Sequence, residues 1–516
     1  MNLRMTRLES TLARLAHTRG DEPKYLAGLM ISPHTWEEFD MITHKWIPTS
    51  VGLIAPHEVV RDIHLLAPRA DFNAALLQFL IGLVQTTMAP QNERAWKNIY
   101  KNPPSESDLQ AAFAPLISTF DYKIFMQDFA EFDGKTNNIS GLLPETPGDQ
   151  TCRLDTDFFV KRDTVKHLCK SCTATALLSH NLNASSDGVG YRTGLRGGGP
   201  LTTIAIGDTL WETIWLNILE TPDLGDSESD EIFPWMCPTH TAEVHSAEVN
   251  PLLMYWAMPR RIHIDWDTTV HTTCDICGQM DDCITEYSAK NYGNNYKGSW
   301  RHPLSPYYTY KEETLPVHAN PGGVTYKHWL GLLYADQTTG YQAALIINKV
   351  LDRYSKFKNL GESLSRNIRI SAFGYDFDNA KVRTWYESTM PIIHSNVPDY
   401  EVNIAKLVHS AATIISNTKS CVKSAYYGKA KVRGDLSPIS IRMWAETEDR
   451  FYKTIHQLST GADVSDEWLS YLKSISFSIF DELTDGAPDP KRIVEARKSL
   501  YNFNNKSVEK IWNTQI

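Results

Sequence analysis

The chain has 516 residues, of which 42% are hydrophobic and 22% are charged, and its formal net charge is −10. This length predicts two to four domains with enough apolar residues for packed cores. No apolar run approaches the roughly 20 residues that a membrane-spanning helix needs, and the basic N-terminus lacks the apolar segment of a secretory signal. The acidic balance argues against a free-standing protein that binds nucleic acid through its overall charge.

The first two thirds of the chain mix short strand-like and helical patterns. The expected helix at 71–89 has the strongest pattern, because apolar residues recur at helical spacing and Asp71 can cap its start. A further helix opens at Ser105 and Asp108. In chain order the elements expected are a short helix at 5–16, strands at 39–42 and 45–48, helices at 71–89 and 105–120, a long surface loop at 126–169, helices at 173–179 and 210–219, a solvated acidic linker at 223–231 and a strand at 261–266.

From about residue 382 the pattern changes to long apolar-periodic segments. Breakers at Gly434, Gly461 and Gly486 separate the last four of them. Helices joined by short loops predict an antiparallel four-helix bundle. The periodic segments are 382–389, 399–417, 436–460, 464–484 and 488–503.

Two Cys-x-x-Cys pairs, Cys169 with Cys172 and Cys274 with Cys277, lie about a hundred residues apart. A gap of two residues lets both sulfurs of a pair reach one ion, and Gly278 allows the tight turn that follows. The pairs therefore predict a structural Zn²⁺ that joins two distant segments, because four thiolates leave no open position for water. The alternative is two unrelated reduced pairs.

The other cysteines show no pairing pattern, which favours a reducing compartment and a cytoplasmic protein. They are Cys152, Cys237, Cys283 and Cys421.

Two stretches are basic although the chain is acidic. Residues 153–196 carry seven Lys/Arg against four Asp, a local net charge of +3, and residues 404–433 carry six Lys/Arg and no acid. Such runs contact a polyanion or form a solvated helix face, and composition alone leaves both open. The candidate phosphate contacts are Arg192, Arg196, Lys419, Lys423, Lys429, Lys431 and Arg433.

The glycines at 194 and 197–199 form no phosphate-binding motif, since no Gly-Lys-Ser/Thr follows them, and a tight packing loop is the favoured interpretation. No nucleophile elbow, paired-acid nuclease pattern or histidine metal spacing is present. We therefore expect no enzyme.

Several motifs occur together in a specific order. Taken together they closely resemble the CasA family, the large subunit of the type I-E CRISPR surveillance complex Cascade. The resemblance runs from about residue 39 to the C-terminus and leaves out residues 1–38. The motifs are Trp46-Ile47-Pro48, Met88-Ala89-Pro90, Asn102-Pro103, Phe125-Met126-Gln127, Cys169-x-x-Cys172 with Thr173-Ala174-x-Ala176-Leu177, Gly194-Leu195-Arg196-Gly197-Gly198-Gly199-Pro200-Leu201-Thr202-Thr203, Cys274–Gln279 and Trp300-x-His302-Pro303-x-Ser305-Pro306.

The resemblance implies an α+β protein with an appended segment at 1–38, a mixed α/β domain with the zinc site at 39–380 and the four-helix bundle at 381–516. It also implies a non-enzymatic subunit that reads the protospacer-adjacent motif (PAM) from the minor groove of double-stranded DNA. A wedge opens the duplex, and the subunit helps to recruit a trans-acting helicase-nuclease. The implied partners are CRISPR RNA, target DNA and the backbone, small and guide-5′-end-binding subunits of the complex.

The resemblance also assigns residues to these roles. A lysine-bearing loop corresponds to Lys290. The glycine loop corresponds to Ser186, Asp187, Gly188, Val189 and Gly190, the wedge to Asp378, Asn379 and Ala380, and the guide-RNA and subunit docking loop to Phe158, Phe159, Val160 and Lys161, with Phe159 as the stacking residue.

The sequence departs from the family pattern at two of these elements. The wedge position holds Asn379 where the family has Gln, one methylene longer. The glycine loop holds Asp187 and Val189, and a carboxylate near a groove edge alters which base pairs are accepted.

Two other functions compete with DNA recognition. One is a zinc-stapled structural scaffold without direct DNA readout. The other is a zinc-dependent hydrolase acting on nucleic acid, and ligation by four cysteines argues against it because a catalytic zinc needs an open position.

Overall fold

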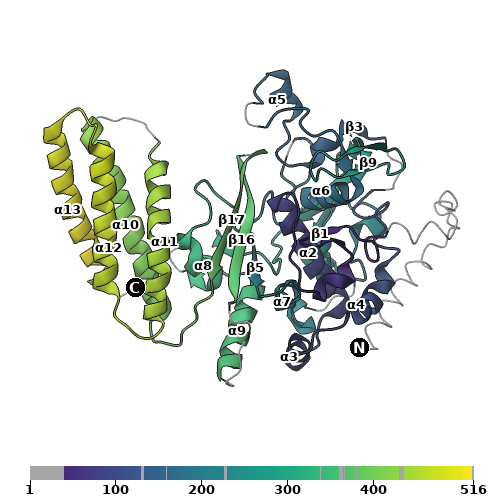
Figure 1. Ribbon diagram of the computed structural model, residues 1–516, viewed down its shortest axis with the longest axis horizontal. Helices are drawn as coiled ribbons and strands as arrows, with labels where there is room; N and C mark the ends of the chain where they lie inside the picture. Colours follow the sequence, from purple (N-terminus) through teal and green to yellow (C-terminus); the bar gives the residue numbers. More distant parts are fainter. Residues whose placement is uncertain are drawn as a thin grey trace.

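The computed structural model describes residues 40–128, 133–157, 160–186, 188–225, 229–336, 339–359, 364, 367–378, 380–428 and 435–513. The helix expected at 5–16 lies outside these residues. Figure 1 shows a mixed α/β body on one side, a long hairpin in the middle and a group of C-terminal helices on the other side. No helix in the described ranges is long and apolar enough to cross a bilayer.

The helices of the mixed body are short apart from α2 and α9. They are α2 (Ala70–Met88), α3 (Glu93–Lys101), α4 (Glu106–Phe113), α5 (Asp149–Arg153), α6 (Lys170–Leu182), α7 (Leu210–Leu216), α8 (Trp329–Leu333) and α9 (Leu345–Asn359), with 3-10 turns η2 (Pro56–Val60), η3 (Ala114–Leu116), η4 (Ile139–Leu142), η5 (Thr221–Leu224), η6 (Pro234–Met236), η7 (Ser246–Glu248), η8 (Pro251–Trp256) and η9 (Tyr326–His328).

The strands of the described residues form small sheets. The pairs and orders are β1 (Ile47–Thr49) with β2 (Gly52–Ile54); β3 (Lys135–Asn138), β10 (Glu286–Lys290) and β7 (Arg261–His263); β4 (Leu168–Cys169), β9 (Met280–Ile284) and β8 (Val270–Thr273); β11 (Asn295–Lys297) with β6 (Glu243–His245); β13 (Glu313–Pro316), β12 (Tyr307–Tyr310), β15 (Tyr341–Gln342) and β14 (Ala335–Asp336); and β17 (Lys381–Pro391), β16 (Arg369–Asp378) and β5 (Thr202–Ile206).

Helix α2 is the centre of the mixed body, and its prediction is confirmed. Phe79 makes edge contacts with Trp46, Phe120, Phe125 and Trp256, with ring centroids between 5.2 and 6.0 Å apart. Such aromatic packing accounts for a large share of core energetics. The expected cap is wrong: Arg69 holds the N-cap position, and Asp71 in the first turn pairs with Arg69 at 2.9 Å.

The prediction of a helical segment at 382–389 is wrong, because these residues lie in β17. Strands β16 and β17 pair in antiparallel register from Arg369↔Pro391 to Asp378↔Lys381, with an irregularity at Asp376 and Phe377. The segment contains residues that favour strands, such as Val382, Trp385 and Tyr386, and it pairs with a strand that lies close in sequence. The expected division between residues 380 and 381 falls at the turn of this hairpin.

Three smaller expectations also change. The strand expected at 39–42 is reduced to an isolated bridge from Asp40 to Asp121. The loop expected at 126–169 contains β3, η4 and α5, and Ile139 and Leu142 of η4 are fully buried. In the acidic linker, Asp223 pairs with Lys349 at 2.6 Å and is not simply solvated.

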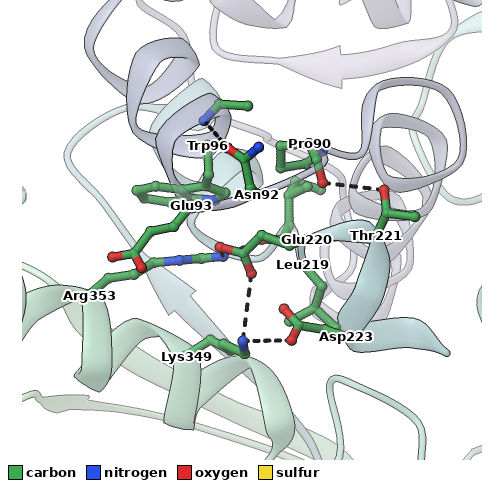
Figure 2. A network of polar contacts seen from close by, with 12 residues as sticks. Pro90, Asn92, Glu93, Trp96, Leu219, Glu220, Thr221, Asp223, Lys349 and Arg353 are labelled. Carbon is green, nitrogen blue, oxygen red and sulfur yellow. Dashed lines mark hydrogen bonds and ion pairs between the residues drawn. The ribbon is translucent and has the colours of Figure 1, made fainter.

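Within the mixed body, a buried polar network joins helix α9 to α3 and to the segment at 218–220 (Figure 2). Arg353 is 2% exposed, donates to the Ile218 carbonyl at 3.1 Å and pairs with Glu220 at 3.0 Å. Its guanidinium also lies over the Trp96 ring, 4.0 Å from the centroid. Because α9 packs on β5, this network fixes the sheet that carries the hairpin.

The C-terminal segment contains the long helices that the periodicity predicted. They are α10 (Tyr400–Tyr427), α11 (Ser437–Leu458), α12 (Ser465–Thr484) and α13 (Pro490–Asn513). Helix α10 packs against the other three, and a buried polar layer joins Thr418 to Ser476 at 2.8 Å and Ser476 to Asn504 at 3.2 Å. Tyr326 of η9 stacks on Phe451, which connects these helices to the rest of the chain.

Candidate metal centre and nucleic-acid interface

Two distant segments bring four cysteines together. Cys169 ends β4 and caps α6, so that Cys172 lies in the first turn of that helix, while Cys274 and Cys277 lie in the turn between β8 and β9. Their sulfur atoms all lie within 4.8 Å of one another, and Cys169 Sγ is 3.7 Å from Cys277 Sγ. The predicted meeting of the two pairs is therefore confirmed, and the cluster could hold a metal ion.

Backbone hydrogen bonds shape the second pair and attach it to the first. Cys274 N donates to the Gln279 carbonyl at 2.8 Å, and Gly278 N donates to the Cys274 carbonyl at 2.9 Å. The Asp275 carboxylate accepts from the backbone N–H groups of Lys166 and His167 at 2.7 and 2.8 Å. These contacts hold the β8–β9 turn beside the chain that leads into β4.

The donor set fits a tetrahedral thiolate site. A Zn–S bond of about 2.3 Å gives sulfur–sulfur edges of about 3.8 Å in a tetrahedron, close to the 3.7 Å separation of Cys169 and Cys277. Four thiolates this close together would repel one another, and a cation at their centre would offset that repulsion. Cys283 lies on β9 beside the cluster but donates to the Thr272 carbonyl at 3.5 Å.

None of the eight cysteines, all of which the structure describes, is in a disulfide.

Lys290 lies at the end of β10, exposed, at the edge of a shallow hollow of about 660 Å³. Three cations line this hollow with one carboxylate. Arg261 lies opposite Lys290 in the β7–β10 register and forms an ion pair with Asp128. The lining residues are Asp133, Lys135, Thr241, Arg261, Ala289, Lys290, Asn291 and Tyr292.

The glycine loop contacts the turn that follows Lys290. Asn291 Nδ2 donates to the Val189 carbonyl at 2.7 Å, and Tyr292 N donates to the Gly190 carbonyl at 2.8 Å. Gly190 has a φ of +79°, and a Cβ there would lie 2.8 Å from the Asn291 Cβ, so glycine is required. Val189 is 79% exposed. The fold thus brings together two elements that are a hundred residues apart in sequence.

In this loop Ser186 and Gly188 are also exposed. Asp187 lies outside the described residues.

The glycines at 197–199 pack closely against their neighbours, as the tight packing interpretation predicted, and Gly199 lies against β16 near the tip of the hairpin. Gly199 has a φ of +60°, and a Cβ there would lie 2.5 Å from the Phe377 ring. Near the tip, Arg383 pairs with Asp376 at 2.7 Å and with Asp378 at 3.4 Å. Of the expected wedge residues, Asp378 is exposed and Ala380 half-buried, while Asn379 lies outside the described residues.

The prediction of Arg196 as a phosphate contact is wrong. The residue is 4% exposed, and its guanidinium donates to Gln78 at 2.8 Å, Thr202 at 3.0 Å and Ser305 at 3.1 Å. Burial lowers the pKa of Arg196 to about 10. The side chain therefore connects α2, β5 and the Ser305 segment inside the protein.

Arg192 is half-buried, and its guanidinium lies 5.7 Å from the centroid of the Tyr292 ring. Tyr292, Asn291 and Lys135 border the hollow but were not singled out in the sequence. The available signal was weak: a polar turn, Asn291-Tyr292-Gly293, directly after Lys290.

The ends of the expected docking loop are joined by an ion pair. Arg162 Nη2 lies 2.8 Å from the Asp157 carboxylate, and the Arg162 backbone N–H donates to it at 3.2 Å. Hydrogen bonds from Arg162 hold the pKa of Asp157 well below its usual range. Val160 and Lys161 are exposed between these ends, and Phe158 and Phe159 lie outside the described residues.

The basic stretch of the C-terminal part begins on α10. Lys419 and Lys423 are half-buried and, four residues apart, lie on one face of the helix. Lys429, Lys431 and Arg433 lie outside the described residues.

Comparisons with known proteins agree with this architecture. Residues 40–479 match the model of the family described as CRISPR-associated protein Cse1. The structure is similar to that of Thermus thermophilus CasA (Cse1), with a TM-score of 0.68 at 15% identity, covering 92% of this chain and 100% of that one. It is equally similar to Thermobifida fusca Cse1, with a TM-score of 0.68 at 16% identity over 92% of this chain and 97% of that one.

A third similar chain belongs to a structure described as a CRISPR RNA-guided surveillance complex. The TM-score is 0.64 at 16% identity, over 90% of this chain and 99% of that one. At these identities the structural likeness shows a shared fold.

Proposed function

The chain belongs to the CRISPR-associated protein Cse1 family, and from that premise we propose that it is the large subunit of an RNA-guided surveillance complex. In this role it reads the PAM in double-stranded DNA from the minor groove and starts duplex opening. A chain of the same fold occurs in a structure described as a CRISPR RNA-guided surveillance complex.

One observation carries the DNA-reading role. Lys290 is exposed beside a hollow lined by cations, and the turn after it is hydrogen-bonded to the Gly188–Gly190 loop. The minor groove presents few distinguishing groups, so a short motif is readable by one lysine and by backbone groups held beside it. Cations around the hollow hold phosphates without reading sequence.

The β16–β17 hairpin supplies the wedge in this proposal. Its tip lies beyond the last pair, Asp378↔Lys381, and in this proposal Asn379 is the residue that enters the base stack. Unstacking one step costs a few kcal/mol, and pairing of the target strand with guide RNA offsets it and supplies sequence specificity. Gly199 supports the hairpin near this tip, because the absence of a side chain lets Phe377 pack closely against it.

The remaining partners follow the family pattern. The docking loop with Phe158, Phe159, Val160 and Lys161 contacts the 5′ end of the guide RNA and a neighbouring subunit. Helices α10–α13, as an antiparallel four-helix bundle, contact other subunits of the complex, and Lys419 and Lys423 lie near phosphates. The subunit helps to recruit a trans-acting helicase-nuclease in the prokaryotic cytoplasm and has no catalytic role of its own.

We assign the cysteine cluster to one structural Zn²⁺. Cys169, Cys172, Cys274 and Cys277 would hold it, and the ion would supply only cross-linking, because four thiolates leave no open position. Its position supports DNA reading indirectly. Strand β9 of the cluster sheet continues through Thr285 into β10, which ends at Lys290.

The test is duplex binding by the complex, assembled with guide RNA, across a library of randomised flanking trinucleotides. We expect flank-dependent binding with the wild-type chain and its loss with Lys290→Ala, while the complex still assembles. Lys297→Ala removes an exposed lysine of β11 and serves as the matched control. Binding that is indifferent to the flank in the wild-type complex would reject the proposal and leave a zinc-stapled scaffold subunit.

A further inference from the structure

Tyr292 is held in a backbone conformation that large residues rarely adopt. Its φ is +64°, in the left-handed region, and half of its surface (50%) is exposed. A bulky residue in this region is strained, and such strain persists only where the surrounding structure enforces it. Strained residues are concentrated at binding sites and switches. The strained backbone at Tyr292 therefore suggests that this turn has a function.

The neighbouring backbone enforces this conformation from two sides. Tyr292 N donates to the Gly190 carbonyl at 2.8 Å, and Asn291 Nδ2 donates to the Val189 carbonyl at 2.7 Å. On the other side, a Cβ on Gly293 would lie 2.1 Å from the Pro259 carbonyl oxygen, so the chain after Tyr292 lies against the segment before β7. The turn is therefore clamped between the glycine loop and the segment at Pro259.

The ring of Tyr292 borders the same hollow as Lys290. The Arg192 guanidinium lies 5.7 Å from the ring centroid, and Arg192 Nε is buried without a hydrogen-bond partner among the described residues. Arg192 therefore supports the ring as a packing cation. An exposed aromatic ring beside cations is the combination with which proteins hold nucleic-acid backbone and stacked bases.

We propose that Tyr292 is a further DNA-contacting residue. Lys290 enters the minor groove of the duplex, and the Tyr292 ring packs against a deoxyribose of that same duplex. This inference rests on the proposed function. Deoxyriboses form the walls of the minor groove. Tyr292 follows Lys290 by two residues, so when the lysine enters the groove the tyrosine ring lies close to the wall of that groove. Sugar contacts position the protein and carry no sequence information.

The contact has a signature different from that of Lys290. Tyr292→Asn removes the ring, and apart from glycine Asn is among the residues that best tolerate a left-handed backbone. We expect this variant to weaken binding about tenfold for every flank in the library, because the lost sugar contact carries no sequence information. The salt dependence should be unchanged, because no charge is lost. Tyr292→Phe retains the ring and should bind as the wild type does.

A matched control exists on another sheet. Tyr310 of β12 is 55% exposed, and the Lys311 ammonium lies 5.2 Å from its ring centroid. Tyr310→Asn removes a similar ring away from the hollow and should leave DNA binding unchanged. Thermal unfolding of each variant shows whether the fold is retained.

A second measurement does not depend on a loss of affinity. A photo-crosslinking benzoylphenylalanine at position 292, in the complex with guide RNA, should crosslink to the flanking duplex of bound DNA, whereas the same group at position 310 should not. Crosslinking to guide RNA or to another subunit would overturn the inference.

Wild-type binding by Tyr292→Asn, with a clear effect of Lys290→Ala, would overturn this inference and leave the proposed function standing. If Lys290→Ala and Tyr292→Asn both bind as the wild type does, the proposed function itself fails.

Discussion

The guanidinium of Arg353 lies over the ring of Trp96, 4.0 Å from its centroid, and joins α9 to α3. The same side chain pairs with Glu220, which is 8% exposed, at 3.0 Å (Figure 2). A cation so deeply buried is stable only while both its aromatic and its carboxylate partner are in place.

Replacing Arg353 should therefore cost much of the stability of the fold. Arg353→Met fills a similar volume but leaves the buried Glu220 with only the longer contact to Lys349 at 3.8 Å, and we expect a loss of about 3–5 kcal/mol in the free energy of unfolding. Urea unfolding measures it. Arg442→Met breaks the exposed pairs of Arg442 with Glu446 and Glu482 and should change stability little. Equal effects of the two substitutions would contradict the structural role of Arg353.

Gly199 sets the position of the hairpin. Gly199→Ala introduces a Cβ 2.5 Å from the Phe377 ring at a φ of +60°. Gly461→Ala has a φ of +86° but no atom within 4 Å of the new Cβ. Both variants should show a conformational cost of about 1–2 kcal/mol, and Gly199→Ala should lose clearly more. Equal losses of unfolding free energy in the two variants would mean that the Phe377 ring moves aside without destabilising the fold.

The cysteine cluster should bind one metal ion per chain. We expect metal analysis of the purified protein to find about one zinc, and Cys274→Ser to lower this content and the melting temperature together. Cys152→Ser, which changes a half-buried cysteine outside the cluster, serves as the control. A wild-type protein without metal, whose melting temperature does not respond to a strong chelator, would reject the assignment.

The buried side chain of His302 should make the stability of the fold decrease at acidic pH. It is 2% exposed, accepts a hydrogen bond from Leu304 N at 3.1 Å, and has a pKa well below 6.5, because burial and the nearby Arg196 charge disfavour the imidazolium. Below pH 6.5 the His302 imidazole binds a proton in the unfolded chain but stays neutral in the folded chain. Stability is therefore complete above pH 6.5 and decreases as the pH falls, by about 1.4 kcal/mol per pH unit for one such histidine.

The measurement is the free energy of unfolding between pH 7.5 and 5.5. His302→Gln should reduce the slope of stability against pH over this range. His328, whose pKa burial lowers to about 3, acts in the same direction and keeps part of the slope. An unchanged slope in His302→Gln would show that this histidine is protonated without unfolding.

Local pattern in the sequence identified the long helices and the four cysteines that cluster. The apolar spacing at 71–89 and after residue 399 is a short-range signal, and the structure contains α2 and α10–α13 there. The two Cys-x-x-Cys pairs met as predicted, because the spacing within each pair already fits one ion. The prediction of a helical segment at 382–389 is wrong, because these residues form a strand that depends on pairing with β16.

The sequence by itself determined the family, the helical segments and the four cysteines, because these depend on residues that lie close together along the chain. Only the tertiary structure decided that Arg196 is enclosed between Gln78 and Ser305 and that Tyr292 stands beside Lys290, clamped by Gly190. The burial and the orientation of these two side chains are set by elements about a hundred residues away in the sequence. The charge of an arginine and the ring of a tyrosine are visible in the sequence, but their exposure is not.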